Sequence, residues 1–215
     1  MTPRRSSLLR LSKLTESIIQ QYSSGSFLMA DASGELGWYQ SKVHAVFPLQ
    51  NPMECPRSLA KLVRRGTFQI RVDCDFAGTV AGCAARKETW ISEELRHVYQ
   101  ILNSDGVAHS FEAWDGPVLA GGILGITVGS AFIGESMFYS VPNASKVALV
   151  QCAEYLRFCG YTLFDAQIQN PHLARFGAQE IERERYIPLL KSAVATPPKR
   201  DFATAWESSD WLRLL

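Results

Sequence analysis

Several patterns that mark common classes of functional site are missing from this chain of 215 residues. It has no G-x-x-x-x-G-K-S/T phosphate loop and no G-x-G-x-x-G fingerprint, so neither ATP nor a dinucleotide has a recognisable binding loop. The segment Gly134-Glu-Ser-Met-Phe138 departs from the G-x-S-x-G nucleophile elbow at its last position. The histidines lack metal-ligand spacing, and the acids of Asp73-Cys-Asp75 are more typical of solvated or helix-capping groups. We therefore expect neither a metal ion nor a cofactor.

Neither the cysteines nor the net charge points to a particular kind of functional site. The five cysteines include no C-x-x-C pair, which argues against a zinc ribbon or a thioredoxin-like redox pair. Cys152 and Cys159 lie about two turns apart in an expected helix, too far to form a disulfide bond. Free thiols indicate a reducing compartment. The net charge of +1 argues against a uniformly basic surface but is compatible with a local basic patch.

No hydrophobic run has the character of a signal peptide or a membrane span. Near the N-terminus, leucines alternate with Arg10 and Lys13, which is the pattern of an amphipathic helix. The apolar stretch 118–138 contains five glycines, β-branched residues and Glu135, so it is better explained by buried strands. We expect a cytoplasmic, monomeric protein that makes no membrane contact.

The order of the expected elements predicts an α+β fold in which helices cover a mixed sheet. Periodicity and turn signals predict helices over 7–23, 56–65, 76–86, 93–103, 144–159 and 182–193. They predict strands over 68–72, 108–114, 118–128, 131–139 and 161–167, whereas 26–55 is expected to be irregular.

Three polar residues stand out within these expected strands. A carboxylate such as Glu135, inside an apolar strand, is costly unless it meets a cation or several hydrogen-bond donors. Asp165 and Gln167 lie two positions apart on one expected strand, so their side chains should share a face. If the two strands are neighbours, the three groups converge at one edge of the sheet. Spacing alone favours this arrangement no more than exposed polar residues at a strand end.

A series of linked motifs resembles, in order, those of the leucyl/phenylalanyl-tRNA–protein transferase family. The resemblance spans about residues 16 to 190. The family's T-W-I, A-H-S-x-E-x-W, G-E-S-M-F, N-A-S-K-x-A-L, D-C-Q and H-L…L-G-A motifs correspond to Thr89–Ile91, Ala108–Trp114, Gly134–Phe138, Asn143–Leu149, Asp165–Gln167 and His172–Ala178.

The resemblance implies a fold and an activity. The fold would be a small N-terminal domain, here residues 1–45, and an acetyltransferase-like (GNAT) catalytic domain, residues 46–195, followed by a polar tail, residues 196–215. The activity would be transfer of Leu or Phe, with Met as a further donor side chain, from aminoacyl-tRNA to the α-amine of an N-terminal Arg or Lys. Such transfer marks a protein for N-terminal-rule degradation. The acetyl-CoA pyrophosphate loop, Q/R-x-x-G-x-G/A, is absent, in agreement with an aminoacyl-tRNA donor.

The resemblance also implies roles for individual residues. Asp165 and Gln167 would form the catalytic pair, and Glu135 would hold the N-terminal residue of the acceptor. Because a neutral amide is a very weak base, we expect Asp165 to orient Gln167, and Gln167 to align the amine. Met137 and Phe138 would lie beside the pocket for the transferred side chain.

Other implied roles concern the RNA. Trp90 would stack on the terminal adenine of the tRNA. Lys61, Arg64 and Arg65, here called the basic cluster, occupy the family's basic stretch and would contact phosphates of the acceptor stem. The family's G-I-F-P-W motif ends here in Met29, so a thioether replaces the second adenine-stacking tryptophan.

Two further positions depart from the family's motifs. The family's W-W-S-P-x-P-R becomes Trp38-Tyr-Gln-Ser-Lys-Val-His44, which loses both prolines and the arginine. Ala166 replaces the cysteine between the catalytic pair and is expected to point to the opposite face of the strand, with little effect.

Three alternatives remain. A leucyltransferase for acidic N-termini is opposed by Glu135, whose carboxylate would repel such an acceptor. A GNAT-type acyl-CoA acyltransferase is opposed by the missing pyrophosphate loop. An RNA-binding module that has kept the fold is opposed by the intact Asp165, Gln167 and Glu135.

Overall fold

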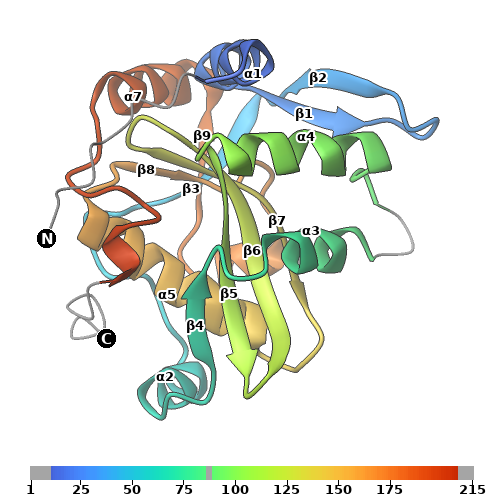
Figure 1. Ribbon diagram of the computed structural model, residues 1–215. Coiled ribbons are helices and arrows are strands. Elements are labelled where there is room, and N and C mark those ends of the chain that lie inside the picture. Colours follow the sequence, from blue (N-terminus) through green and yellow to red (C-terminus); the bar gives the residue numbers. More distant parts are fainter. Residues whose placement is uncertain (1–10, 86–88, 208–215) are drawn as a thin grey trace, which may run out of the picture.

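The computed structural model describes residues 11–85 and 89–207 (Figure 1). It has an α+β fold with a seven-stranded mixed sheet, in the order β4-β5-β6-β7-β8-β3-β9, and a separate two-stranded sheet, β1-β2. The elements are α1 (Lys13–Ser23), β1 (Ser26–Ala30), β2 (Leu36–Gln40), β3 (Val43–Phe47), α2 (Arg57–Arg64), β4 (Gln69–Val72), α3 (Phe76–Ala84), α4 (Glu93–Ser104), β5 (Ala108–Asp115), β6 (Val118–Val128), β7 (Ala131–Tyr139), α5 (Ala144–Cys159), β8 (Leu163–Asp165), α6 (Pro171–Ala174), β9 (Gln179–Glu182), α7 (Arg183–Ala195) and η1 (Ala205–Glu207).

The centre of the large sheet is the antiparallel meander β5-β6-β7, followed by a parallel pairing of β7 with β8. The glycine-rich apolar stretch 118–138 forms the β6-β7 hairpin, which confirms its prediction as buried strands. No helix of the described residues is long and apolar enough to cross a membrane.

Helices cover both faces of this sheet, as predicted for the fold class (Figure 1). Neighbouring residues of β6 show the alternation: Ile123 packs in the core beneath α5, whereas Leu124 packs in the core beneath α1, α3 and α4. α7 packs on β8, β3 and the edge strand β9, and Tyr186 and Leu190 are buried against Val46.

The expectation that residues 26–55 are irregular is wrong, because they contain β1, β2 and β3. Each of these strands is only five residues long, and β1 and β2 are joined by a turn with a positive φ at Gly34. Their pattern is therefore too short to stand out from the surrounding glycines and prolines. β9 and α6 are additional elements that periodicity did not predict.

Several predicted boundaries also change, and residue 86 of the helix predicted over 76–86 lies outside the described residues. The N-terminal helix begins at Lys13, after the capping residue Ser12, and residues 7–10 of its predicted range lie outside the described residues. The strand predicted over 161–167 ends at Asp165. β3 runs across the predicted domain boundary between residues 45 and 46, and it lies between β8 and β9 in the large sheet.

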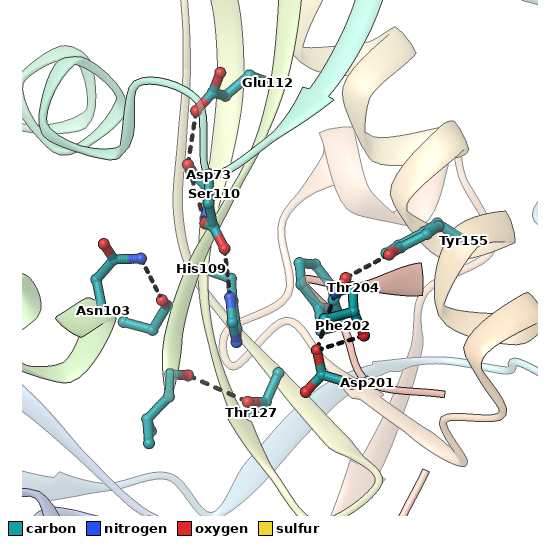
Figure 2. A network of polar contacts seen from close by, with 12 residues as sticks. Asp73, Asn103, His109, Ser110, Glu112, Thr127, Tyr155, Asp201, Phe202 and Thr204 are labelled. Atoms are coloured by element: carbon teal, nitrogen blue, oxygen red, sulfur yellow. Dashed lines mark hydrogen bonds and ion pairs between the residues drawn. The ribbon is translucent and has the colours of Figure 1, made fainter. Parts of the chain in front are cut away.

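The segment after Thr196, described above as a polar tail, places an aromatic side chain in the core. Phe202 is 1% exposed, and its ring stacks on Phe132 with 5.6 Å between ring centroids. Its carbonyl oxygen accepts a hydrogen bond from the Tyr155 hydroxyl on α5 (Figure 2). The segment is polar in composition, yet Phe202 packs it against the sheet and α5, and Arg200 and Trp206 make further contacts with α5.

A second polar network joins the β4–α3 connection to β5 (Figure 2). The Asp73 carboxylate accepts hydrogen bonds from His109 Nδ1 and from the backbone N–H of Ser110, both at 2.7 Å. The Asp75 carboxylate accepts from the N–H of Gly78 at the start of α3. Asp75 is therefore a helix cap, one of the two roles expected for these acids, and Asp73 is held by β5.

Candidate functional site

A cavity of about 420 Å³ opens where β7 and β8 separate. β8 pairs with β7 as far as Ile133 and ends at Asp165, whereas β7 continues to Tyr139. The β7 residues after Ile133 and the chain after Asp165 therefore line a gap in the sheet. The lining is mostly apolar and includes Met29, Phe47, Trp90, Ile123, Met137, Leu149 and Leu173, with Glu135, Gln167, Gln169 and Asn170 as polar groups.

Glu135 is the only acid among the residues described as lining this cavity. Its side chain is 6% exposed, and its carboxylate accepts hydrogen bonds from the Tyr99 hydroxyl and from Gln167 Nε2, both at 2.9 Å. Burial raises the pKa of Glu135 to about 8, against the opposing effect of these hydrogen bonds. Burial thus favours the protonated carboxyl group, and a cation that enters the cavity would favour its ionised form.

Gln167 is held by its backbone as well as by its side chain. It has a φ of 61°, which is unusual for a residue other than glycine, and its N–H donates to Asp165 Oδ1 at 2.8 Å. Its carbonyl oxygen accepts from the N–H of Ala45 at 2.9 Å. Because Nε2 donates to Glu135, the amide oxygen of Gln167 is the atom left to accept a hydrogen bond from a bound group.

Asp165 and Gln167 do not share a strand face, because β8 ends at Asp165 and Gln167 follows in the left-handed conformation. The Asp165 side chain points away from the cavity and is 2% exposed. Asp165 Oδ2 accepts a hydrogen bond from the Tyr186 hydroxyl at 2.6 Å and lies 3.2 Å from His44 Nδ1. The other carboxylate oxygen, Asp165 Oδ1, accepts from the backbone N–H of Gln167. Asp165 would therefore orient Gln167 through the backbone and not through the side chain.

His44 and Tyr186 are residues of the site that the sequence reasoning did not identify. Their rings stack with 3.6 Å between centroids, and His44 is 1% exposed. His44 Nδ1 lies within hydrogen-bond distance of Asp165 Oδ2, at 3.2 Å. Nε2 of His44 has no partner among the described residues. The available signal was the position of His44 at the end of the altered W-W-S-P-x-P-R motif, where the family has an arginine.

Tyr99 is a further missed residue, since it was expected only as part of a helix. It is fully buried on α4, and burial together with the charge of Glu135 raises the pKa of its hydroxyl well above the usual range. The hydroxyl therefore stays a donor to Glu135. A tyrosine on a buried helix face needs such a partner, and this requirement was the signal in the sequence.

The predicted donor-binding residues divide into two groups. Met29, Trp90 and Met137 line the cavity, and the N–H of Ala30 donates to the carbonyl oxygen of Trp90 at 3.1 Å, which holds Trp90 beside β1. Phe138 does not line the cavity: it lies on the face of the sheet opposite to Met137 and packs closely over Gly82 of α3.

The two remaining predictions concern Ala166 and the basic cluster, which lies at the end of α2 and is called the α2 basic cluster from here on. Ala166 lines the cavity, so the expectation that it points to the opposite face is wrong. The cause is again the early end of β8, after which strand alternation no longer applies. Lys61, Arg64 and Arg65 are exposed at the C-terminal end of α2, and none of them lines the cavity.

Comparison with known proteins identifies the family of this chain. The family described as leucyl/phenylalanyl-tRNA protein transferase matches residues 46–191, and its N-terminal domain matches residues 14–42. The chain is 54% identical over 185 residues to the leucyl/phenylalanyl-tRNA–protein transferase of Synechococcus sp. (strain JA-3-3Ab), covering 86% of this chain and 96% of the relative. It is 44% identical over 180 residues to that of Rubrobacter xylanophilus, covering 83% and 94%. The chain therefore belongs to the leucyl/phenylalanyl-tRNA–protein transferase family.

Proposed function

We propose that this protein transfers Leu or Phe from aminoacyl-tRNA to the α-amine of an N-terminal Arg or Lys. The observation that carries the proposal is the pairing of Glu135 with Gln167 at 2.9 Å in the wall of an apolar cavity. This arrangement provides one acidic group for a basic acceptor and one amide oxygen for its amine. The family membership supports the aminoacyl-tRNA donor.

The donor would occupy the apolar part of the cavity. Trp90 and Met29 would contact the terminal adenine, and Met137 would contact the transferred side chain. Apolar pockets discriminate weakly between side chains of similar size, so Leu, Phe and some Met would be accepted. A volume of about 420 Å³ is within the usual range for small-molecule pockets.

The chemistry is the aminolysis of an ester. The amine nitrogen forms a bond with the aminoacyl carbonyl carbon, and the ester bond to the ribose oxygen breaks. The amine loses one proton and the ribose hydroxyl gains one. The ester is already activated, so ATP is not consumed. An α-amine has a pKa of about 7.7–8.0, which leaves a useful neutral fraction, and the enzyme's main contribution would be positioning.

Two residues would position the acceptor. The amide oxygen of Gln167 would accept a hydrogen bond from the α-amine, while Asp165 fixes the backbone of Gln167. Glu135 would bind the basic side chain of the acceptor. The approach of a guanidinium or ammonium group lowers the pKa of Glu135 and so draws the carboxyl group into its charged form. An acidic acceptor would instead meet a second carboxyl group in a buried site.

The proposal extends to the domain organisation and the cellular role of the protein. We propose a GNAT-like catalytic domain at residues 46–195, supported by the β7–β8 pair that separates around the cavity. The smaller N-terminal domain, residues 1–45, would contribute Met29 to the donor site. The protein would act in the cytoplasm as a monomer and mark its targets for N-terminal-rule degradation.

The test is transfer of radiolabelled Leu from leucyl-tRNA to peptides that begin with Arg, Lys, Asp or Glu, without added ATP. Label on the Arg and Lys peptides alone is the expected result. Label on acidic peptides would identify a transferase for acidic N-termini. The absence of label on every peptide would overturn the proposal and favour an acyl-CoA acyltransferase or an RNA-binding module.

The role of Glu135 needs matched variants. Glu135→Gln should retain the fold and lose most transfer to Arg and Lys peptides, and Glu135→Lys should abolish it through charge repulsion. Glu180→Gln removes an exposed carboxylate on β9 and serves as the control. Full activity of Glu135→Lys on Arg peptides would remove Glu135 from the acceptor site.

A further inference from the structure

A second cavity, of about 200 Å³, lies between α2, α5 and α6. Its polar lining comes from Ser58, Asn143, Lys146, His172 and Arg175. Among the described residues that line it there is no Asp or Glu. The cavity is distinct from the one that contains Glu135, since the two have no lining residue in common.

The charge around this second cavity is positive and uncompensated. In the described part of the chain, no carboxylate forms an ion pair with Lys146, His172 or Arg175. Partial burial, and then the nearby charges of Lys146 and Arg175, lower the pKa of His172. Lys146 Nζ donates to Asn143 Oδ1 at 3.2 Å, which holds the ammonium group beside the start of α5. An anion that entered the cavity would relieve this repulsion.

Two helix N-termini add to the positive potential. α5 begins after Asn143, which has a φ of 72° and whose side chain does not cap the helix. α2 begins after Pro56, again without a side-chain cap. The first turn of each helix lines the cavity, through Lys146 on α5 and Ser58 on α2. Uncapped backbone N–H groups at a helix start attract anions, and phosphate in particular.

The second cavity also lies on a path from the first cavity to the α2 basic cluster. On α5, Leu149 lines the first cavity, and Lys146, one turn earlier, lines the second. On α6, Leu173 lines the first cavity and its neighbour His172 lines the second. α2, which packs beside α5, then carries the basic cluster at its far end (Figure 1).

We propose that the second cavity binds an internucleotide phosphate in the single-stranded 3′ end of the donor RNA, one or two nucleotides before the aminoacylated adenosine. The proposal rests on the proposed function, because it assumes that the adenosine occupies the first cavity. Lys146 and Arg175 supply the charge, and Ser58 and the helix N–H groups supply further donors. The strand then continues toward the α2 basic cluster.

The test compares three leucyl donors that differ in their phosphates: 3′-O-leucyl-adenosine, the leucylated trinucleotide CCA, and leucyl-tRNA. The test variant is the double substitution Lys146→Gln with Arg175→Gln. Lys191→Gln, which removes an exposed charge from α7, is the matched control. The quantity measured is kcat/KM for transfer to an Arg peptide over a range of salt concentrations.

The expected result is a loss of about tenfold or more with the trinucleotide and with tRNA, and no loss with leucyl-adenosine. The salt dependence should weaken by about one unit of log–log slope for each phosphate contact removed. The control should match the wild type on all three donors. An equal loss on leucyl-adenosine would assign Lys146 and Arg175 a structural role and overturn the proposal, as would unchanged activity with tRNA.

A binding measurement keeps this test independent of catalysis. Unacylated CCA is titrated into the wild type and the double variant, and adenosine is titrated as the phosphate-free reference. If the variant binds CCA more weakly than the wild type but binds adenosine equally well, the phosphate site is supported, whether or not transfer is detected. A lack of transfer would count against the proposed function alone. Equal binding of CCA by the two proteins would overturn the phosphate site.

Discussion

Replacing Glu135 with glutamine should change how the stability of the fold depends on pH. The carboxyl group is buried, receives hydrogen bonds from Tyr99 and Gln167, and has no positively charged partner among the described residues. Burial raises its pKa from an ordinary value of 4.5 to about 8. Glutamine has a similar shape and can still accept one hydrogen bond, but it does not titrate.

The sign of the effect follows from proton linkage. Between the two pKa values the folded protein keeps a proton on Glu135 that the unfolded chain has released, so the free energy of unfolding falls as pH rises. The favourable contribution is complete below the unfolded pKa and is lost as pH rises through the folded pKa. Each pH unit corresponds to about 1.4 kcal/mol, and the interval of about 3.5 units limits the total to about 5 kcal/mol.

The assay is urea denaturation followed by circular dichroism, from about pH 5 to about pH 8, for the wild type and Glu135→Gln. All other titrating groups contribute almost equally to both proteins, so the difference between the two curves isolates Glu135. We expect the wild type to lose stability relative to the variant by about 1.4 kcal/mol per pH unit. Glu180→Gln should follow the wild type. Parallel curves for the wild type and Glu135→Gln would refute the assignment of a raised pKa to Glu135.

Three other substitutions test separate parts of the structure. Phe202→Ala should cost about 3–5 kcal/mol in thermal or urea unfolding because the ring is 1% exposed, and an unchanged Tm would show that the segment after Thr196 does not pack on the core. Gln167→Glu removes the donor to Glu135 and places a second carboxyl group beside it, so kcat for transfer should fall about tenfold or more; an equal or higher kcat would assign Gln167 the role of a base. Met29→Trp should lower KM for leucyl-tRNA about fivefold by stacking on the adenine, and an unchanged KM would place Met29 outside the base-binding part of the cavity.

Much of the fold follows from local patterns in the sequence. The alternation and turn signals of 108–139 predict the β5-β6-β7 meander, and the helical spacing from Ala144 to Cys159 predicts α5. β1, β2 and β3 cannot be predicted in this way because five-residue strands contain too few alternations to be distinguished from loops. β8 is misjudged for a related reason: its end at Asp165 is set by the separation from β7 and not by a change in composition.

The sequence by itself determined the family, through the number and order of its motifs, and it identified Glu135, Asp165 and Gln167 as the polar residues of interest. Only the tertiary structure decided how they are arranged. His44 and Asp165, whose buried side chains lie within hydrogen-bond distance, are 121 positions apart in the chain, and Tyr99 and Glu135 are 36 apart. Such contacts depend on which strands pair and which helices cover them, and local periodicity in the sequence does not predict this arrangement. For the same reason, the sequence placed Asp165 and Gln167 side by side, whereas the fold turns one toward His44 and Tyr186 and the other toward Glu135 and the cavity.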